Sequence, residues 1–370
     1  MKFNKLKNIV TVLVFGILMF SISAMCYFGG YEEYSDSERR PLAVFPAFTK
    51  DTVLSGDFMT DFEEYTTDQF PYRDKFRSAK ALFLGKVLNK MDNNGVYYAD
   101  GHISKIDEKE NEYMLNYSAE LFRSIYEKNI IGKNANVYFS IVPGKNVFLA
   151  QKNGYPYRNY ENLKKYMVDK TSDFMTYIDI DEKLSLDYYY TTDSHWKQEK
   201  IGVVAKTLAE TMGTDISAEY TVKTLDNPFY GVYTGQSALP VKPDTIKYLT
   251  NDELEKSVVT YYSTGKPQTG SLYNMDDAYG KDPYEMFLSG TEPLIVIENS
   301  SAKTEKELVM FRDSFASSLA PLMVSGYKKI TLVDIRYMQS SIVGNFVDFA
   351  DSDVLFIYSD ELLNNSLAMK

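Results

Sequence analysis

Residues 308–322 read LVMFRDSFASSLAPL, and this stretch joins an apolar run to a predicted helix. The run Leu308–Phe311 is short and continuous, which is typical of a strand that is buried on both faces. Residues 315–324 carry small and apolar side chains and predict a helix. Ser314 therefore stands at a strand-to-helix turn, the kind of position at which α/β proteins place their functional sites.

Further apolar runs lie on both sides of this stretch. They predict strands at 137–141, 177–180, 294–297, 330–333 and 354–358, and apolar residues at helical spacing predict helices around 74–89, 112–128, 161–175 and 202–212. Strands that alternate with helices favour an α/β fold with a parallel sheet flanked by helices. Residues 214–290 are rich in Tyr, Gly, Pro and Asp and lack helical periodicity, so they predict a β-rich insertion.

The first 28 residues predict where the protein is located. Three lysines precede the uncharged run Ile9–Phe28, whose twenty residues are enough to cross the hydrocarbon of a bilayer as a helix. Positive charge before such a span keeps the N-terminus cytoplasmic and places the rest of the chain outside. We therefore expect an uncleaved signal-anchor and a single-pass membrane protein. A cleaved signal peptide followed by secretion stays open as the alternative, because small residues follow the apolar core.

Composition and charge exclude several classes of protein. Cys26 is the single cysteine, so no disulfide can form within the chain, and the methionine before it makes a poor lipoprotein site. Only two histidines are present, which leaves no Cys/His zinc cluster, and we expect neither a metal nor another cofactor. Three of the 40 basic residues lie in the first 28, so 37 basic and 51 acidic residues remain beyond the span. This acidic balance argues against nucleic-acid binding.

One histidine has a carboxylate at a spacing that suits catalysis. His195 follows an extended tyrosine run, and in an extended segment residues i and i+2 point the same way. Asp193 could therefore orient the imidazole of His195 and stabilise its charged form. A loop aspartate paired with a partly buried histidine is the alternative. His102 has no such neighbour, and we expect it to be structural.

A catalytic base needs a nucleophile, and Ser314 is the first candidate. Its hydroxyl would lie at a helix N-terminus, where backbone amides can stabilise a developing oxyanion. The alternative is that Ser314 or Asp313 only caps the helix. Ser237 ranks lower, because no apolar strand precedes it and the second glycine of a nucleophile elbow is missing.

Other polar residues follow predicted strands and would share the same edge of the sheet. Lys145 follows strand 137–141, and Arg336 and Tyr337 follow strand 330–333. Each could contact a substrate or be a solvated loop residue. The 31 tyrosines suit stacking on sugar rings, although sheet packing also uses tyrosine.

Two motifs connect the chain with a known family. The segments YYTTDSHW at 189–196 and FRDSF at 311–315 resemble the DHHW-motif proteins of Gram-positive bacteria. These proteins are in turn similar to the SGNH-hydrolase-like proteins that O-acetylate alginate. The likeness covers nearly the whole chain beyond residue 28, and its other segments are 37–42, 68–73, 94–97, 142–145, 333–337 and 355–358.

The resemblance implies an SGNH-hydrolase-like α/β domain that carries a triad of Ser314, His195 and Asp193. It also implies a partner, a multi-spanning membrane acyltransferase that supplies the acyl donor across the bilayer. The acceptor would be a polysaccharide.

The chain departs from the family patterns at two places. The first histidine of the DHHW motif is Ser194 here, and the glycine that precedes Asp-Ser in SGNH enzymes is Arg312. A Gly-x-Asn-Asp block, which supplies an oxyanion asparagine, is also missing. Oxyanion stabilisation and substrate binding would then rest on the Ser314 amide and on Arg312, Arg336 or Tyr337.

The leading interpretation is an extracytoplasmic, membrane-anchored O-acetyltransferase of a cell-surface or secreted polysaccharide. Residues 1–28 would form the anchor, residues 29–110 a stalk and the start of the catalytic domain, and residues 111–370 the SGNH-like domain with its insertion at about 214–290. Two alternatives stay open: a carbohydrate esterase with the same triad, and a non-catalytic polysaccharide-binding subunit.

Overall fold

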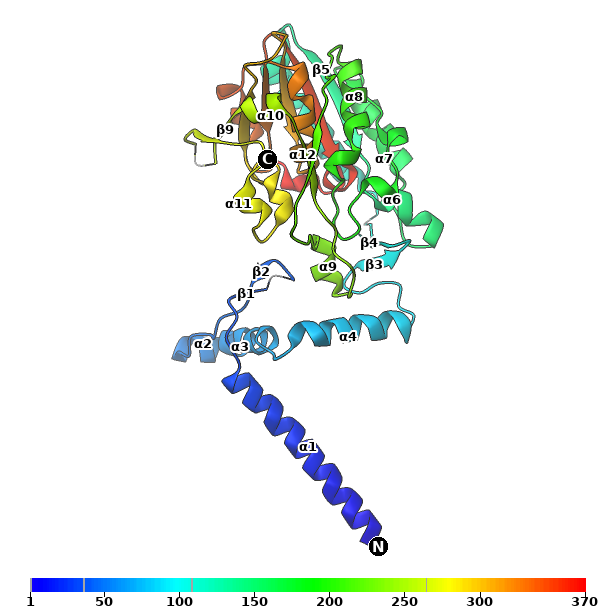
Figure 1. Ribbon diagram of the computed structural model, residues 1–370, viewed down its shortest axis with the longest axis vertical. Coiled ribbons are helices and arrows are strands. Elements are labelled where there is room, and N and C mark those ends of the chain that lie inside the picture. Colours follow the sequence, from blue (N-terminus) through cyan, green and yellow to red (C-terminus); the bar gives the residue numbers. More distant parts are fainter. Residues whose placement is uncertain (1, 36, 108, 264) are drawn as a thin grey trace. The chain divides into compact units, whose positions relative to one another are not determined.

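The computed structural model describes residues 2–35, 37–107, 109–263 and 265–370 (Figure 1). The chain forms two compact units. The first unit contains Met1–Asn93 and Thr234–Pro240, and the second contains Asn94–Tyr233 and Val241–Lys370.

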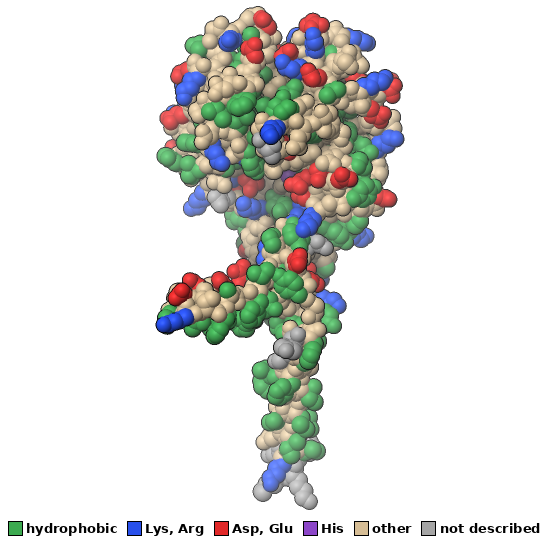
Figure 2. Space-filling model, turned by 90° about the vertical axis from the view of Figure 1, so that its left-hand side faces the viewer, with side chains coloured by type: hydrophobic (Ala, Val, Ile, Leu, Met, Phe, Trp, Pro, Cys, Tyr) green, Lys and Arg blue, Asp and Glu red, His purple; other side chains and the backbone are tan. Residues whose placement is uncertain are grey.

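The first unit begins with the expected apolar helix. Helix α1 spans Lys2–Phe28, and its segment Lys5–Cys26 is long and apolar enough to cross a membrane. Hydrophobic side chains cover much of its surface (Figure 2). The strand pair β1 (Tyr34–Ser35) and β2 (Arg40–Pro41) follows, and then come the helices α2 (Lys50–Ser55), α3 (Asp57–Asp68) and α4 (Arg73–Lys86). The orientation of α1 in a membrane and its cleavage stay predictions.

An ion-pair network joins two of the family-like segments, 37–42 and 68–73, within this unit. The guanidinium of Arg40 donates to both carboxylate oxygens of Asp68, at 2.6 and 2.7 Å, and the Ala43 amide donates to the same carboxylate at 3.0 Å. The Arg40 guanidinium holds the pKa of Asp68 below its usual value. Arg73 adds a bridge of 2.7 Å to Glu38. The charged residues of these two segments therefore stabilise each other.

The second unit is built on one eight-stranded sheet. Its strand order is β10-β9-β11-β13-β12-β14-β5-β6. The strands are β5 (Asn136–Val142), β6 (Thr176–Tyr177), β9 (Val258–Tyr261), β10 (Gln268–Gly270), β11 (Leu294–Glu298), β12 (Glu307–Arg312), β13 (Lys329–Val333) and β14 (Ser352–Ser359). The predicted α/β fold with a central sheet flanked by helices is confirmed.

The sheet is mixed, although the sequence predicted a parallel one. Strands β13, β12, β14, β5 and β6 run parallel, whereas β11 runs antiparallel to β13, and β9 and β10 continue the antiparallel part. A parallel crossover needs a dozen or more residues, usually with a helix. Only residues 299–306 connect β11 to β12, and they contain no helix, so β11 reverses its direction instead.

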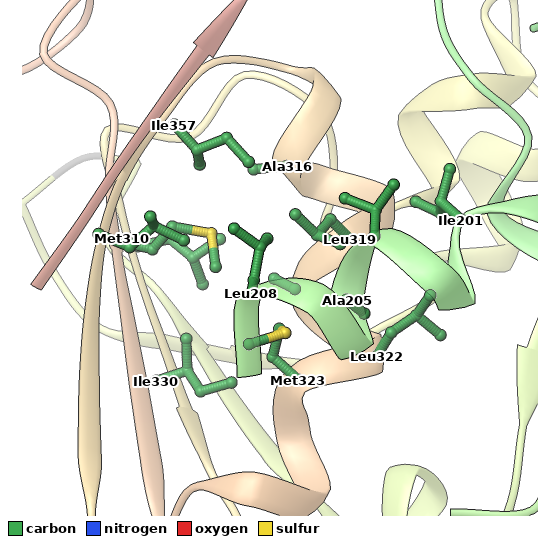
Figure 3. Close-up of a cluster of buried hydrophobic side chains, with 14 of the residues drawn as sticks. Ile201, Ala205, Leu208, Met310, Ala316, Leu319, Leu322, Met323, Ile330 and Ile357 are labelled. Carbon is green, nitrogen blue, oxygen red and sulfur yellow. The ribbon is translucent and has the colours of Figure 1, made fainter. Parts of the chain in front are cut away.

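Two layers of helices cover the sheet because side chains alternate along each strand. On one face, α8 (Gly202–Thr211) and α12 (Phe315–Met323) pack against residues such as Met310 (Figure 3). On the other face, α5 (Glu112–Ile125) and α7 (Tyr160–Thr171) pack against Val309 and Phe311. The two clusters form the core.

The described part of residues 214–290 contains the short strands β7 (Thr221–Thr224), β8 (Lys247–Thr250), β9 and β10, as predicted. It also contains three short helices, α9 (Val232–Ser237), α10 (Asp252–Lys256) and α11 (Met275–Ala278). Helices of four to six residues are too short to show a period in the sequence. Local capping starts two of them, as when the side chain of Asn251 accepts from the Leu254 amide. The remaining strands and α-helices of the second unit are β3 (Val96–Ala99), β4 (His102–Lys105), α6 (Asn146–Leu149) and α13 (Asp360–Leu363).

Candidate active site

Asp193, His195 and Ser314 form a continuous hydrogen-bonded chain. Nε2 of His195 lies 2.8 Å from Oγ of Ser314, and Nδ1 of His195 lies 2.6 Å from Oδ1 of Asp193. The Asp193 side chain is 2% exposed and that of His195 is 17% exposed, so solvent reaches the imidazole but hardly the carboxylate. The imidazole of His195 and the hydroxyl of Ser314 are brought together although 119 residues separate them in the sequence.

The side chain of Ser314 can hydrogen-bond with His195 because another residue caps helix α12. Ser314 follows β12 and precedes α12, and its side chain makes no capping hydrogen bond. Oδ1 of Asp313 instead accepts from the Phe315 amide at 3.0 Å, and Oδ2 accepts from the Ser359 amide at 2.7 Å. No described residue accepts a hydrogen bond from the Ser314 amide. This amide can therefore donate to an oxyanion that forms beside Ser314.

The local conformation differs from the extended segment that the sequence predicted. Residues 191–195 form a series of bends, and Oδ1 of Asp193 also accepts from the backbone amide of His195 at 3.1 Å. The carboxylate meets the imidazole because the backbone turns around it. The prediction that the two side chains lie together is nevertheless met by the 2.6 Å contact.

The insertion supplies partners that hold the loop of Asp193. Oδ2 of Asp193 accepts from the Val232 amide at 2.9 Å. The carboxylate of Asp244 accepts from the amides of Thr191 and Thr192 at 2.9 and 2.8 Å. A Cβ on Gly231 would lie 2.4 Å from the Cβ of Asp193, so only glycine fits there. No signal in the sequence predicted these residues, since nothing in their neighbourhood marks them as partners of a distant loop.

Aromatic side chains fix the plane of the imidazole. The ring of Tyr284 stacks on His195 at 4.0 Å with an interplanar angle of 13°, and the ring of Phe315 lies 5.1 Å away. The hydroxyl of Tyr284 hydrogen-bonds with Oγ of Ser318 at 2.9 Å, and burial raises the pKa of Tyr284 well above its usual value. Nε1 of Trp196 donates to the carbonyl of Phe315 at 3.0 Å. The histidine loop is thus attached to the first turn of α12.

Lys145 lies beside the triad, but its hydrogen bonds go to the backbone of the loop that carries Asp193. Its ammonium donates to the carbonyls of Tyr190, Thr191 and Asp193 at 3.1, 3.2 and 2.7 Å. The residue is 2% exposed, and burial lowers its pKa to about 7. This geometry makes Lys145 a positioning residue for Asp193 and His195 rather than a solvated loop residue, and its contact with a substrate stays a prediction.

Lys145→Met is expected to destabilise the second unit by about 3 kcal/mol, because three buried carbonyls lose the side-chain nitrogen that donates to them. The same change should slow any reaction that depends on His195, since the loop loses its attachment. Thermal melting and a rate measurement on the full chain check this. Lys152→Met, at an exposed lysine, is the matched control and should change neither quantity. An unchanged melting temperature for Lys145→Met would contradict the assignment.

The stability that Lys145 contributes should also depend on pH. Burial lowers the folded pKa of Lys145 from 10.5 to about 7. Between these values the unfolded chain binds a proton that the folded chain has released, so the free energy of unfolding rises with pH in this window. Lys145→Met lacks this gain. Its free energy of unfolding should therefore fall further below that of the wild type, by about 2 kcal/mol more at pH 9 than at pH 7. Denaturant unfolding at both pH values measures the change, and parallel pH profiles would refute it.

The other predicted site residues form a separate buried network. Arg312 is fully buried, where its Nη1 donates to Oγ of Ser317 at 2.9 Å and lies 4.0 Å from the carboxylate of Asp334. Arg336 makes a bidentate pair with the same carboxylate, and its guanidinium lies 5.4 Å from the ring of Tyr337, which is half exposed. None of the hydrogen bonds in the described ranges joins these three residues to Ser314 or His195. Their roles at the site stay predictions.

A small polar cavity lies next to the triad in the second unit. It has a volume of about 50 Å³, and Ser194 and Phe315, which adjoin triad residues in sequence, line one part of it. Asn146 and Arg158 line another part, and both are 5% exposed. Nδ2 of Asn146 and Nε of Arg158 have no hydrogen-bond partner among the described residues. Both atoms are themselves shielded from solvent, and the cavity is lined by polar side chains.

The remaining candidates of the sequence analysis have local partners. His102 lies in β4, and its Nδ1 is 3.3 Å from the carbonyl of Asp100. Ser237 is buried in the first unit, where its hydroxyl donates to the carbonyl of Thr234 at 3.3 Å. Within the described ranges, no group of three His, Cys, Asp or Glu residues could hold a metal ion.

Solved structures share this fold. A DHHW family protein from Eubacterium siraeum matches with a TM-score of 0.59 and 19% identity, over 75% of this chain and 94% of that one. Bacillus cereus PatB1 matches with a TM-score of 0.56 and 19% identity, over 72% of this chain and 96% of that one. A second PatB1 structure, with a sulfonyl adduct, has a TM-score of 0.57 and 18% identity, over 72% and 95% of the two chains.

No family model and no curated protein matches the sequence. At 18–19% identity, the structural matches show the fold. This chain has the fold of the Eubacterium siraeum DHHW family protein and of Bacillus cereus PatB1, in agreement with the resemblance of its YYTTDSHW and FRDSF segments to the DHHW family.

Proposed function

We propose that this chain is a membrane-anchored O-acetyltransferase that modifies a cell-surface or secreted polysaccharide outside the cytoplasm. The observation that carries the proposal is the hydrogen-bonded chain from Asp193 through His195 to Ser314, with distances of 2.6 and 2.8 Å. A serine joined in this way to an oriented imidazole is activated as a nucleophile.

In the first half-reaction, Oγ of Ser314 attacks the acyl carbonyl of the donor while Nε2 of His195 takes the hydroxyl proton. Asp193 stabilises the imidazolium that forms, and the Ser314 amide donates to the oxyanion. The tetrahedral intermediate collapses, the leaving group receives the proton from His195, and an acyl-serine remains. The acyl donor would come from a multi-spanning membrane acyltransferase, as the family resemblance implies.

In the second half-reaction, a sugar hydroxyl takes the place of the leaving group. His195 removes its proton, the sugar oxygen attacks the acyl-serine, and Ser314 is regained as a hydroxyl while the sugar ester departs. The polar side chains that line the adjacent cavity, such as Asn146 and Arg158, suit the hydroxyl or carbonyl oxygens of a sugar. They support a carbohydrate acceptor, and the esterase alternative would use water in the same step.

An acyl-enzyme assay on the full chain in detergent tests the proposal. The chain is incubated with an activated acetyl ester, its intact mass is recorded, and the modified peptide is mapped. We expect one acetyl group on Ser314 and its transfer to an added oligosaccharide. Release of acetate at a rate that no oligosaccharide changes would favour the esterase.

A sulfonyl fluoride provides a second probe of the same residue. Sulfonyl electrophiles form stable adducts with activated nucleophiles, and one PatB1 structure contains a sulfonyl adduct. We expect the reagent to modify Ser314 in this chain and to block its acetylation. A folded chain that reacts with neither reagent would favour the polysaccharide-binding subunit.

A further inference from the structure

The first unit exposes an unusual density of large apolar side chains. Twelve large hydrophobic residues between 44 and 91 are exposed, whereas only fifteen are exposed in all the described residues after 93. Phe48 and Leu54 are each 75% exposed. Scattered exposed apolar residues are normal on a soluble surface, but a concentration of this kind marks an interaction surface.

Helix α4 has two distinct sides. Phe76, Phe83 and Val87 are separated by seven and four residues, so they share one face, and each is more than half exposed. The opposite side faces the interior of the first unit, where Ala81 is 2% exposed and Arg77 donates to the carbonyl of Gly235 at 2.6 Å. The exposed face is therefore not needed for packing within this unit.

Helix α3 carries an aromatic cluster on one face. The rings of Phe58 and Phe62 stack at 5.8 Å, and Phe45 and Phe48 pack edge-on against this pair at 5.0–6.4 Å. Acidic residues of α3 such as Glu63 are exposed, and the helical period places Glu63 on the side opposite Phe58. Figure 2 shows hydrophobic side chains along one edge of the arm that contains α3, and acidic side chains along its opposite edge.

We propose that helices α2–α4 form a platform that lies in the interfacial layer of a phospholipid bilayer, with the exposed apolar faces of α3 and α4 turned toward the acyl chains. This inference rests on the membrane anchor in the proposed function. Helix α1 ends at Phe28 and α2 begins at Lys50, so a tether of residues 29–49 keeps the platform within about 70 Å of the bilayer even when fully extended.

The charge of α4 fits this occupant. Arg73 and Arg77 pair with Glu38 inside the first unit, but residues 73–92 also contain four lysines, which favour contact with anionic headgroups. Lysines next to an apolar face can extend their ammonium groups to the headgroups while their methylene chains stay in the apolar layer. Amphipathic helices with this combination bury their apolar face at the boundary between headgroups and acyl chains. The platform would hold the chain against the membrane beyond the single span.

Spin labels on the full chain test the proposal. Cys26→Ser removes the native thiol, and single cysteines replace Leu54, Phe83 and Glu63 in chains reconstituted into vesicles of phosphatidylcholine and phosphatidylglycerol. Collision with lipid-soluble oxygen is compared with collision with a water-soluble nickel chelate. We expect the ratio of oxygen to nickel collisions to be several-fold higher at positions 54 and 83 than at position 63.

The controls separate this inference from the anchor on which it rests. A label in place of Leu13 of α1 reports the anchor alone. A lipid-embedded label at 13 with water-exposed labels at 54 and 83 would overturn the platform and leave the anchor standing. Water exposure at 13 would overturn the anchor itself, and the platform with it. Spin–spin broadening at 54 or 83 that disappears on dilution with unlabelled chains would show a second copy as the occupant and would also overturn the platform. Melting curves of the labelled chains confirm that each variant is folded.

Discussion

Ser314→Ala is expected to abolish acyl transfer, lowering its rate at least about a thousandfold while the fold stays intact. Oγ of Ser314 is the proposed nucleophile in the first half-reaction and the leaving group in the second, and no other hydroxyl takes its place beside Nε2 of His195 in the described chain. The side chain makes no capping bond to α12, so its loss should cost little stability. Intact mass after incubation with an activated acetyl ester measures the acyl-enzyme, and thermal melting measures the fold.

Ser301→Ala is the matched control for this variant. Ser301 is exposed and lies outside the triad, so the control should retain full acylation. If Ser314→Ala still gains an acetyl group and transfers it, the assignment of the nucleophile is wrong. If acylation is lost together with the folded signal in melting curves, Ser314→Cys repeats the test with a nucleophile of similar size.

Asp193→Asn is expected to lower the rate of acyl transfer by about a thousandfold to ten-thousandfold. The two oxygens of Asp193 accept from different donors, Nδ1 of His195 and the Val232 amide. An asparagine has one oxygen and one NH₂ group, so it cannot accept from both. If it keeps the bond to Val232, its NH₂ group faces Nδ1 and favours the tautomer that carries the proton on Nε2. That tautomer cannot accept the proton of Ser314.

The rate of acetylation of Ser314, followed by mass spectrometry, measures this effect. Asp187→Asn is the control, because Asp187 lies in the same segment but is exposed. Near-normal acylation in Asp193→Asn would show that the carboxylate is not required and that His195 is oriented by its aromatic neighbours alone. A fold that remains intact separates this result from simple loss of the loop.

The parts of the site that the sequence predicted share a local signature. Asp193 and His195 lie two residues apart, and Ser314 follows an apolar run and precedes a helical one. The sheet was predictable for the same reason, since buried strands read as continuous apolar segments. The direction of β11 was predictable as well, because only ten residues separate the apolar runs 294–297 and 308–311, which is too few for a parallel crossover.

The residues that hold the site in place could not be predicted from the sequence, because they contact residues that lie far from them along the chain. Asp244 and Gly231 come from the irregular insertion and meet a loop some 40 to 50 residues earlier. Lys145 was correctly expected near the edge of the sheet, yet its contacts with three carbonyls depend on how the loop turns. Tyr284 is one of 31 tyrosines, and only its stacking on His195 distinguishes it.

Helix α12 has a consequence for how the protein can move. Every one of its residues from Phe315 to Met323 is buried, including Pro321 within the helix. A helix enclosed on all sides cannot tilt or slide without opening voids in an interior that is packed like a crystal. Ser314 at its start, the proposed nucleophile, therefore stays in place throughout the proposed reaction. Any conformational adjustment to donor or acceptor has to occur in the partly exposed groups around it, and none of the binding energy is spent on bringing the serine into place.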